Sequence, residues 1–145
     1  MHDATLLADV HAAARKVTWA YLATTDGDQP RVRIVHPIWE EATVWIATGR
    51  TSPKARHIER NPRVELFYQV DPTELVHLTV TGRARFVDEM AEKRRLWSLF
   101  DYDLGQFWKD ATDSTYGLVR VDPSRIELTS LAAMMSGTPA RVWRR

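Results

Sequence analysis

The sequence WAYLATTDGDQPRVRIVHPIWEEATVWIATG, residues 19–49, decides the fold class of this chain. It holds three runs rich in β-branched and aromatic residues, Trp19 to Thr24, Arg31 to Trp39 and Thr43 to Thr48. The segments between them, TDGDQP and EEA, are turn-like in length and chemistry. Connections this short join antiparallel neighbours, so we expect the sheet to begin with antiparallel strands.

The regions on either side of this stretch add a helix and a long strand. TLLADVHAAARK, residues 5–16, repeats apolar residues at helical spacing and predicts an amphipathic opening helix. RVELFYQV, residues 63–70, and LVHLTVTGRARFVD, residues 75–88, predict two further strands, the second alternating between apolar and polar side chains. Gly82 falls on its apolar face and indicates a bulge or sharp bend, which favours a barrel over a flat sheet.

The last third of the chain returns to helical spacing before a closing strand. DEMAEKRRLWSLFDYDLGQFWKD, residues 88–110, has the period of a helix, and STYGLVRVDPSRIELTSL, residues 114–131, predicts a strand with a turn or bulge at its DPS. The tail AAMMSGTPARVWRR is neither polar nor plainly periodic. We therefore expect one α+β domain over residues 1–145, mainly β and built on an antiparallel barrel.

Composition excludes several classes of protein. The 145 residues carry 20 Lys+Arg against 19 Asp+Glu, so a net charge of +1 gives no global reason to bind nucleic acid or an anionic membrane. With no cysteine, disulfides, thiolate metal sites and thiol catalysis are excluded. No apolar run approaches the roughly 20 residues of a membrane span, and the start lacks the pattern of a secretion signal. We expect a cytoplasmic protein.

The short helix predicted after residues 19–49 carries basic residues near its N-terminus, which is the unusual end for positive charge. Ser52 and Pro53 predict its N-cap and first position, and Pro62 ends it. The N-terminus of a helix is partially positive and normally attracts acidic residues, yet Lys54 occupies the first turn, with Arg50 before it and Arg56 after it. A solvated basic face is one interpretation, and a bound anion is the other.

Several donors of different kinds can converge on such an anion. Ser52 can cap the helix with its hydroxyl and leave the first backbone N–H groups free, while Lys54 reaches the same point. Gly49 permits close approach of the backbone to a ligand. Arg33, in the preceding β-rich run, can bind phosphate oxygens with two donors at once.

Residues 27–69, GDQPRVRIVHPIWEEATVWIATGRTSPKARHIERNPRVELFYQ, resemble the core of the pyridoxamine 5'-phosphate oxidase-like flavin-binding split barrels. The likeness is to the general stress protein branch and its deazaflavin-dependent relatives, and it covers roughly residues 15 to 130. Its most specific elements are an Arg in an RxRxV strand, a strand ending ATGR, a Ser-x-Lys helix start and NPRVEL, in that order.

This resemblance implies an antiparallel six-stranded split β-barrel with short flanking helices, which forms a homodimer with a flavin mononucleotide (FMN) at each of two sites between subunits. It implies that Arg33, Ser52 and Lys54 hold the cofactor phosphate. Other residues implied at the cofactor are Thr48 and Gly49, along the ring and ribityl groove, and Gln69, a polar position near the flavin.

There are alternatives for both the cofactor and the activity. The deazaflavin coenzyme F420 uses the same groove in relatives, and Arg31, Arg50 and Arg56 could serve its anionic tail. The leading hypothesis is an oxidoreductase that transfers a hydride or electrons to or from an unidentified small molecule, with the cofactor doing the chemistry. A non-catalytic flavin-binding stress protein is the second hypothesis. Nucleic-acid binding through aromatic stacking and the face of Arg83 and Arg85 is a weaker third.

Other candidate residues point to no separate site. The histidines are scattered without an i,i+4 pair, so no metal site is predicted and no catalytic residue is assigned. An aromatic cluster in the last third favours core and interface packing, or a cover over the flavin ring from the partner subunit; its members are Trp97, Phe100, Tyr102, Phe107 and Trp108.

Overall fold

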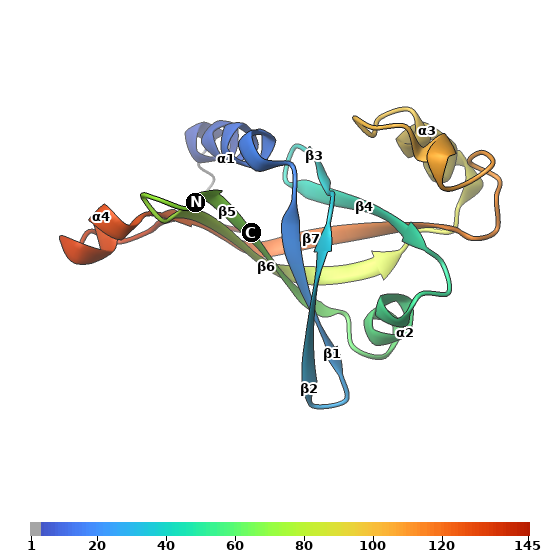
Figure 1. Ribbon diagram of the computed structural model, residues 1–145, viewed down its shortest axis with the longest axis horizontal. Coiled ribbons are helices and arrows are strands. Elements are labelled where there is room, and N and C mark those ends of the chain that lie inside the picture. The colour runs from blue at the N-terminus through green and yellow to red at the C-terminus, as the bar shows by residue number, and fades with distance from the viewer. Residues whose placement is uncertain (1–3) are drawn as a thin grey trace.

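The computed structural model describes residues 4–145, which form an antiparallel sheet flanked by short helices (Figure 1). The helices are α1 (Ala4–Val17), α2 (Pro53–Arg60), α3 (Met90–Trp97), the 3₁₀ turn η1 (Leu104–Gln106) and α4 (Leu131–Met135). The strands are β1 (Ala20–Asp26), β2 (Gln29–Val35), β3 (Ile38–Glu40), β4 (Thr43–Gly49), β5 (Arg63–Asp71), β6 (Val76–Phe86), β7 (Tyr116–Thr129) and β8 (Arg141–Arg144). The prediction of a mainly β, α+β chain is confirmed.

The sheet is larger and more open than the predicted six-stranded barrel. It has eight strands in the order β2-β1-β5-β6-β7-β4-β3, with β8 added to β7, and it does not close. The expected strand from Arg31 to Trp39 is wrong, because His36 and Pro37 interrupt it. Proline has no N–H for a ladder hydrogen bond, so β2 ends at Val35 and pairs with β1, while β3 pairs with β4 at the opposite edge.

The core lies on both faces of β4 and β7. Val44 and Ile46 face a cluster that α1 covers with Leu6 and Val10, while Trp45, between them, faces a second cluster under α3. Alternation of side chains along a strand places the two clusters on opposite sides of the sheet. The apolar stripe predicted for the opening helix is therefore confirmed, and β4 is held from both faces.

The segment after α3 is less helical than its spacing predicts. The expected helix over residues 88–110 stops at Trp97, and only η1 follows it. Carboxylates accept backbone N–H bonds two residues ahead: Asp103 from Gly105, Asp110 from Thr112 and Asp113 from Thr115. Such local bonds compete with helix formation and shape the segment into turns. No helix within residues 4–145 has the length and apolar character needed to cross a bilayer.

The bulge predicted at Gly82 is confirmed. Thr81 is opposite Arg125 and Gly82 is opposite Pro123, so Ser124 is the additional residue of the bulge. A Cβ atom placed on Gly82 would lie 2.5 Å from the backbone oxygen of Asp122. Only glycine fits the backbone there without a shift of β7.

We expect Gly82→Ala to lower the free energy of unfolding by roughly 1–3 kcal/mol, because the added methyl group overlaps backbone atoms that cannot rotate away. Urea denaturation of the cofactor-free protein measures this change. Gly49→Ala is the matched control, since its Cβ would meet its nearest neighbour, Ser52 Cβ, at 3.7 Å. Equal stability of the two variants would contradict the packing argument.

Candidate functional site

A groove of about 590 Å³ lies where the sheet fails to close. One wall contains Ile34, Val35 and His36 at the end of β2, and the other contains Ala47 to Gly49 on β4. β2 pairs only with β1 among the described strands, and β3 reaches β4 only as far as Trp45. The end of β4 therefore presents a free edge to the groove. Tyr102, Phe107 and Trp108 line it from the segment between α3 and β7.

The start of α2 lies at the end of this groove. Ser52 occupies the N-cap position with extended backbone angles, φ −67° and ψ 162°, and Pro53 opens the helix, as predicted. The Ser52 hydroxyl makes no capping bond, which corrects the expectation that it caps the helix. Its Oγ is buried and has no hydrogen-bond partner within residues 4–145. A buried hydroxyl without a partner is costly, so this atom keeps an unused capacity for hydrogen bonding at the start of the helix.

Lys54 turns back from the helix toward the strand that precedes it. Its Nζ donates to Thr48 Oγ1 at 2.7 Å, and Thr48 is itself buried. Burial lowers the pKa of Lys54, and the positive charge of Arg33 lowers that pKa further. The ammonium group has no carboxylate partner within the described chain.

Arg33 reaches the same region from β2. Its Nη1 donates to the carbonyl oxygen of Leu22 at 3.0 Å and to Thr24 Oγ1 at 2.7 Å, and its Nη2 lies 3.4 Å from His57 Nδ1. Burial lowers the pKa of Arg33, and nearby Arg31 contributes to the same shift. Like Lys54, it has no carboxylate partner among residues 4–145. Two half-buried cations thus repel each other beside a free hydroxyl.

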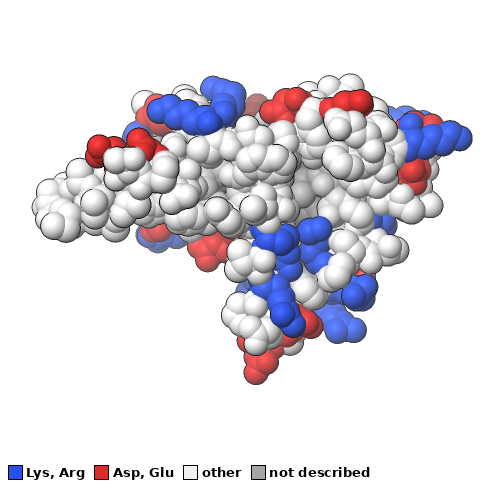
Figure 2. All heavy atoms as spheres, viewed as in Figure 1, with Lys and Arg blue, Asp and Glu red and all other residues white. Residues whose placement is uncertain are grey.

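Two of the other basic residues near α2, Arg50 and Arg31, are paired with carboxylates. Figure 2 shows Lys and Arg side chains gathered around α2 and the β1–β2 hairpin. Arg50 pairs with Asp88 at 3.1 Å and Glu59 at 2.6 Å, and its guanidinium lies 4.1 Å from the centre of the Phe86 ring. Arg31 faces Asp26 at 3.7 Å, and Arg56 reaches the backbone oxygen of Thr51. The unusual charge pattern of α2 therefore has two causes, a surface network around Arg50 and an unpaired site at Lys54.

The structure brings five of the six predicted site residues into one region. Lys54 binds Thr48, the Ser52 N–H donates to the Gly49 carbonyl at 3.1 Å, and Arg33 is close enough to depress the pKa of Lys54. The sixth, Gln69, is exposed on the outer face of β5, in register with His77. It does not line the groove, so its role stays a prediction.

His57 was missed in the sequence and is part of the site. It is buried on α2, and its Nδ1 lies 3.0 Å from Thr24 Oγ1. Because His57 follows Lys54 by three residues, the two side chains share one face of the helix, and this spacing is the signal that could have found it. Within residues 4–145, no three His, Asp or Glu side chains converge as a metal site would require.

Three residues of the predicted aromatic cluster line the groove of the same chain. Phe107 is 63% exposed at its mouth, whereas Tyr102 stacks on His36 with 4.1 Å between ring centres. Burial, together with the charge of Asp101, raises the pKa of Tyr102 to about 12. Its hydroxyl therefore remains protonated at neutral pH and can donate a hydrogen bond.

The site is thus framed by an antiparallel sheet that does not close, with two cations that lack carboxylate partners within residues 4–145 beside the open seam. The sequence pattern of the family described as pyridoxamine 5'-phosphate oxidase matches residues 7–130. The chain belongs to this family. None of the curated proteins compared with it matches significantly.

Solved structures share the fold at low sequence identity. General Stress Protein 26 from Bacillus anthracis is 20% identical, with a TM-score of 0.76 over 97% of this chain and 98% of its own. A pyridoxamine 5'-phosphate oxidase-related, FMN-binding protein from Nostoc punctiforme is 14% identical, with a TM-score of 0.74 over 100% and 99%. A protein named F420 reductase is 22% identical, with a TM-score of 0.62 over 80% and 94%.

We expect Ser52→Ala to leave the stability of the cofactor-free protein unchanged or to raise it, because an unpaired buried hydroxyl costs about 1–3 kcal/mol. The same variant should bind inorganic phosphate more weakly. Urea denaturation and calorimetric titration measure the two effects.

Ser130→Ala is the matched control for this experiment. The Ser130 side chain does accept a bond from the Ala133 N–H at the start of α4, so its loss should cost about 1 kcal/mol. If Ser52→Ala destabilises the protein as much as Ser130→Ala, Ser52 is an ordinary cap.

Proposed function

We propose that the groove binds FMN, or in its place F420, and that the protein is a flavin-dependent oxidoreductase. Membership of the pyridoxamine 5'-phosphate oxidase family supports the general class. The FMN-binding protein and the F420 reductase among the similar structures support these two cofactors. The observation that carries the proposal is the pair of unneutralised cations, Arg33 and Lys54, beside the unpaired hydroxyl of Ser52.

These residues fit a phosphate group. Arg33 offers a planar guanidinium, Lys54 an ammonium and Ser52 a hydroxyl, while the first N–H groups of α2 add the positive end of a helix. Gly49 fits a close ligand as well. Its φ is not positive, and a Cβ there would meet its nearest neighbour at an ordinary 3.7 Å, so packing within the subunit does not require glycine. A ligand packed against the backbone at position 49 would require glycine there.

Bound in this groove, a flavin or deazaflavin supplies hydride or electron transfer. The chain supplies binding, orientation and shelter from water. The free edge of β4 presents backbone groups along the groove, and Tyr102 adds a protonated hydroxyl. Phe107 and Trp108 provide aromatic surface at the mouth.

The charges around the groove favour FMN over F420. The long anionic tail of F420 needs cations beyond the phosphate site, and Arg31, Arg50 and Arg56 are the candidates. Arg31 is engaged by Asp26 and Arg50 by Asp88 and Glu59, so that among these three Arg56, which reaches a backbone oxygen, is left without a carboxylate partner in the described chain. FMN requires only the unpaired cations, Arg33 and Lys54.

A second copy of the chain completes the proposed site. The outer face of β1, β2 and β5 exposes Tyr21, Val32, Ile34 and Phe67, and Tyr21 is in register with both Ile34 and Phe67. Ile34 also lines the groove, so this apolar face is continuous with it. We propose that the face forms a homodimer. Gln69, two residues after Phe67 on the same face, would then approach the partner's groove.

We expect Lys54→Ala and Arg33→Ala each to weaken FMN binding about ten- to a hundred-fold, because a hydrogen bond to a charged group contributes about 1.5–3 kcal/mol. Binding of riboflavin, which lacks the phosphate, should change little. Arg50→Ala is the matched control, as its charge is already neutralised. Fluorescence titration of each variant measures the affinities, and equal losses for FMN and riboflavin would refute the phosphate assignment.

The affinity for FMN should also depend on pH through Lys54. Only the ammonium form attracts phosphate, and the pKa of Lys54 is lowered in the cofactor-free protein. Affinity is therefore complete below that pKa and falls as the pH rises through it, at a lower pH than for an exposed lysine. Lys54→Arg, which keeps its charge, should remove this fall, and an identical pH profile in that variant would count against the role of Lys54.

The dimer predicts that Phe67→Glu or Ile34→Glu yields monomers, since either places a charge on the apolar face. Analytical ultracentrifugation measures the mass in solution. Met135→Glu is the control, because Met135 is 80% exposed on α4, at the far end of the molecule in Figure 1. Dimers that persist in both variants would show that another face associates.

A further inference from the structure

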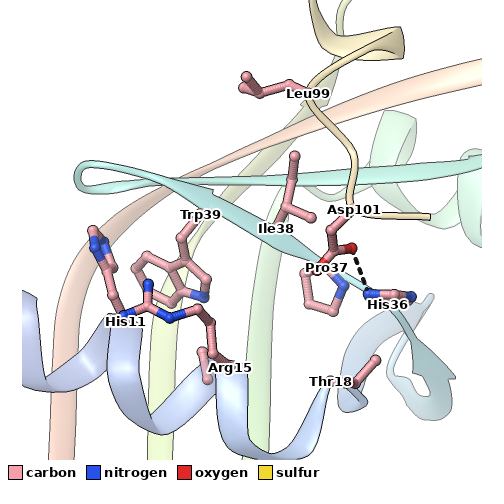
Figure 3. Close-up of a pocket in the computed structure, with 10 residues that line it drawn as sticks. His11, Arg15, Thr18, His36, Pro37, Ile38, Trp39, Leu99 and Asp101 are labelled. Carbon is pink, nitrogen blue, oxygen red and sulfur yellow. Dashed lines mark ion pairs between the residues drawn. The ribbon is translucent and has the colours of Figure 1, made fainter.

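A second cavity, of about 360 Å³, adjoins the groove beneath α1. α1, the residues around β3 and the turn after α3 line it (Figure 3). In that view His11, Arg15 and Trp39 lie toward one end, and the His36–Asp101 pair lies toward the other. Its volume is near the lower end of the range for small-molecule sites, roughly 300–1,000 Å³. It suits a single ring with few substituents.

His36 and Thr18 line both this cavity and the groove, so the two spaces meet at these residues. His36 is held firmly: its Nε2 lies 2.9 Å from Asp101 Oδ1, and its ring stacks on Tyr102 with planes 20° apart. Thr18 has a φ of 63°, an uncommon conformation for a β-branched residue. Backbone strain of this kind concentrates at functional sites, where the surrounding structure enforces it.

The charges in the cavity favour an anion. Arg15 has no carboxylate partner within the described residues, and His11 donates from Nε2 to the Glu41 carbonyl oxygen at 2.7 Å. Among the described residues, Asp101 is the one carboxylate that lines the cavity, and it is engaged by His36. Asp9, elsewhere on α1, is bound by Arg141 at 2.7 Å. A guanidinium without a counterion therefore faces the space.

The walls favour an aromatic ring. Trp39 exposes part of its indole to the cavity, and its Nε1 donates to the Tyr68 hydroxyl at 3.1 Å, which fixes the ring. The His11 ring lies 5.6 Å from it, and Ile38 and Leu99 add aliphatic surface. A flat apolar body and one anionic group are the features that these side chains can recognise together.

We propose that this cavity is the substrate pocket, and that its substrate is a small aromatic carboxylate. The carboxylate binds Arg15, the ring lies against Trp39, and the opposite end of the molecule reaches His36 at the boundary with the groove. This inference rests on the proposed function, because it places the substrate next to the proposed cofactor.

Benzoate and its neutral analogue benzamide test the pocket in the full chain without cofactor, by calorimetry and by NMR of the histidine ring protons. Benzoate should bind more tightly than benzamide and should shift the signals of His11 and His36. Arg15→Ala should weaken benzoate binding about ten-fold and abolish the preference over benzamide. Lys16→Ala, which removes the adjacent cation on the same helix, should change neither. Absence of benzoate binding, or equal effects of the two variants, would overturn the proposal that this cavity binds an aromatic carboxylate through Arg15.

The protein loaded with FMN tests whether the two spaces communicate. Benzoate should perturb the absorption spectrum of the bound flavin, and Arg15→Ala should require about ten-fold more benzoate for the same change. A flavin that binds but does not respond to bound benzoate overturns the substrate assignment and leaves the cofactor proposal standing. Failure of FMN to bind at all, with benzoate still held by Arg15, would instead reject the proposed function and the substrate role with it.

Discussion

The interruption at His36 and Pro37 is the constraint on which the rest of the structure depends. If Arg31 to Trp39 formed one continuous strand, the whole segment would occupy a single position in the strand order. Pro37 cannot donate to a ladder, so β2 ends and the chain crosses to the opposite edge, where β3 joins β4. The seam between β2 and β4 stays open as a result. Its walls are strand ends, and the groove occupies it.

Electrostatics divides the basic residues near this seam into two groups. Arg50 is paired with Asp88 and Glu59 at the surface, where ion pairs contribute little to stability. Because these carboxylates neutralise its charge, Arg50 is a poor candidate for binding an anionic ligand. Arg33 and Lys54 are half-buried and face each other without a carboxylate. Burial of unpaired like charges opposes folding. The phosphate group proposed to bind there would offset this cost.

The groove and the second cavity meet at His36, whose side chain is held by two neighbours. His36 is fixed by Asp101 on one side and by the Tyr102 ring on the other, and both partners come from the segment between α3 and β7. That segment is shaped by local carboxylate turns rather than by a helix. Its irregular path lets aromatic side chains line the groove while Asp101 reaches the second cavity, which a straight helix over residues 88–110 could not do.

The sequence by itself determined the antiparallel, mainly β fold, the helix from Pro53 and the bulge at Gly82, because these depend on local periodicity, proline and glycine. The assignment of Arg33, Ser52 and Lys54 to a phosphate came from the family resemblance and stays a prediction. Only the tertiary structure decided that the sheet has eight strands and stays open, that Ser52 Oγ is unpaired and that Arg50 is neutralised. It also decided that Gln69 does not line the groove, that His57 contacts Thr24 and that His36 lines the groove. These features depend on contacts between residues far apart in the chain, such as Arg50 with Asp88 and His36 with Asp101, and local sequence patterns carry no information about such contacts.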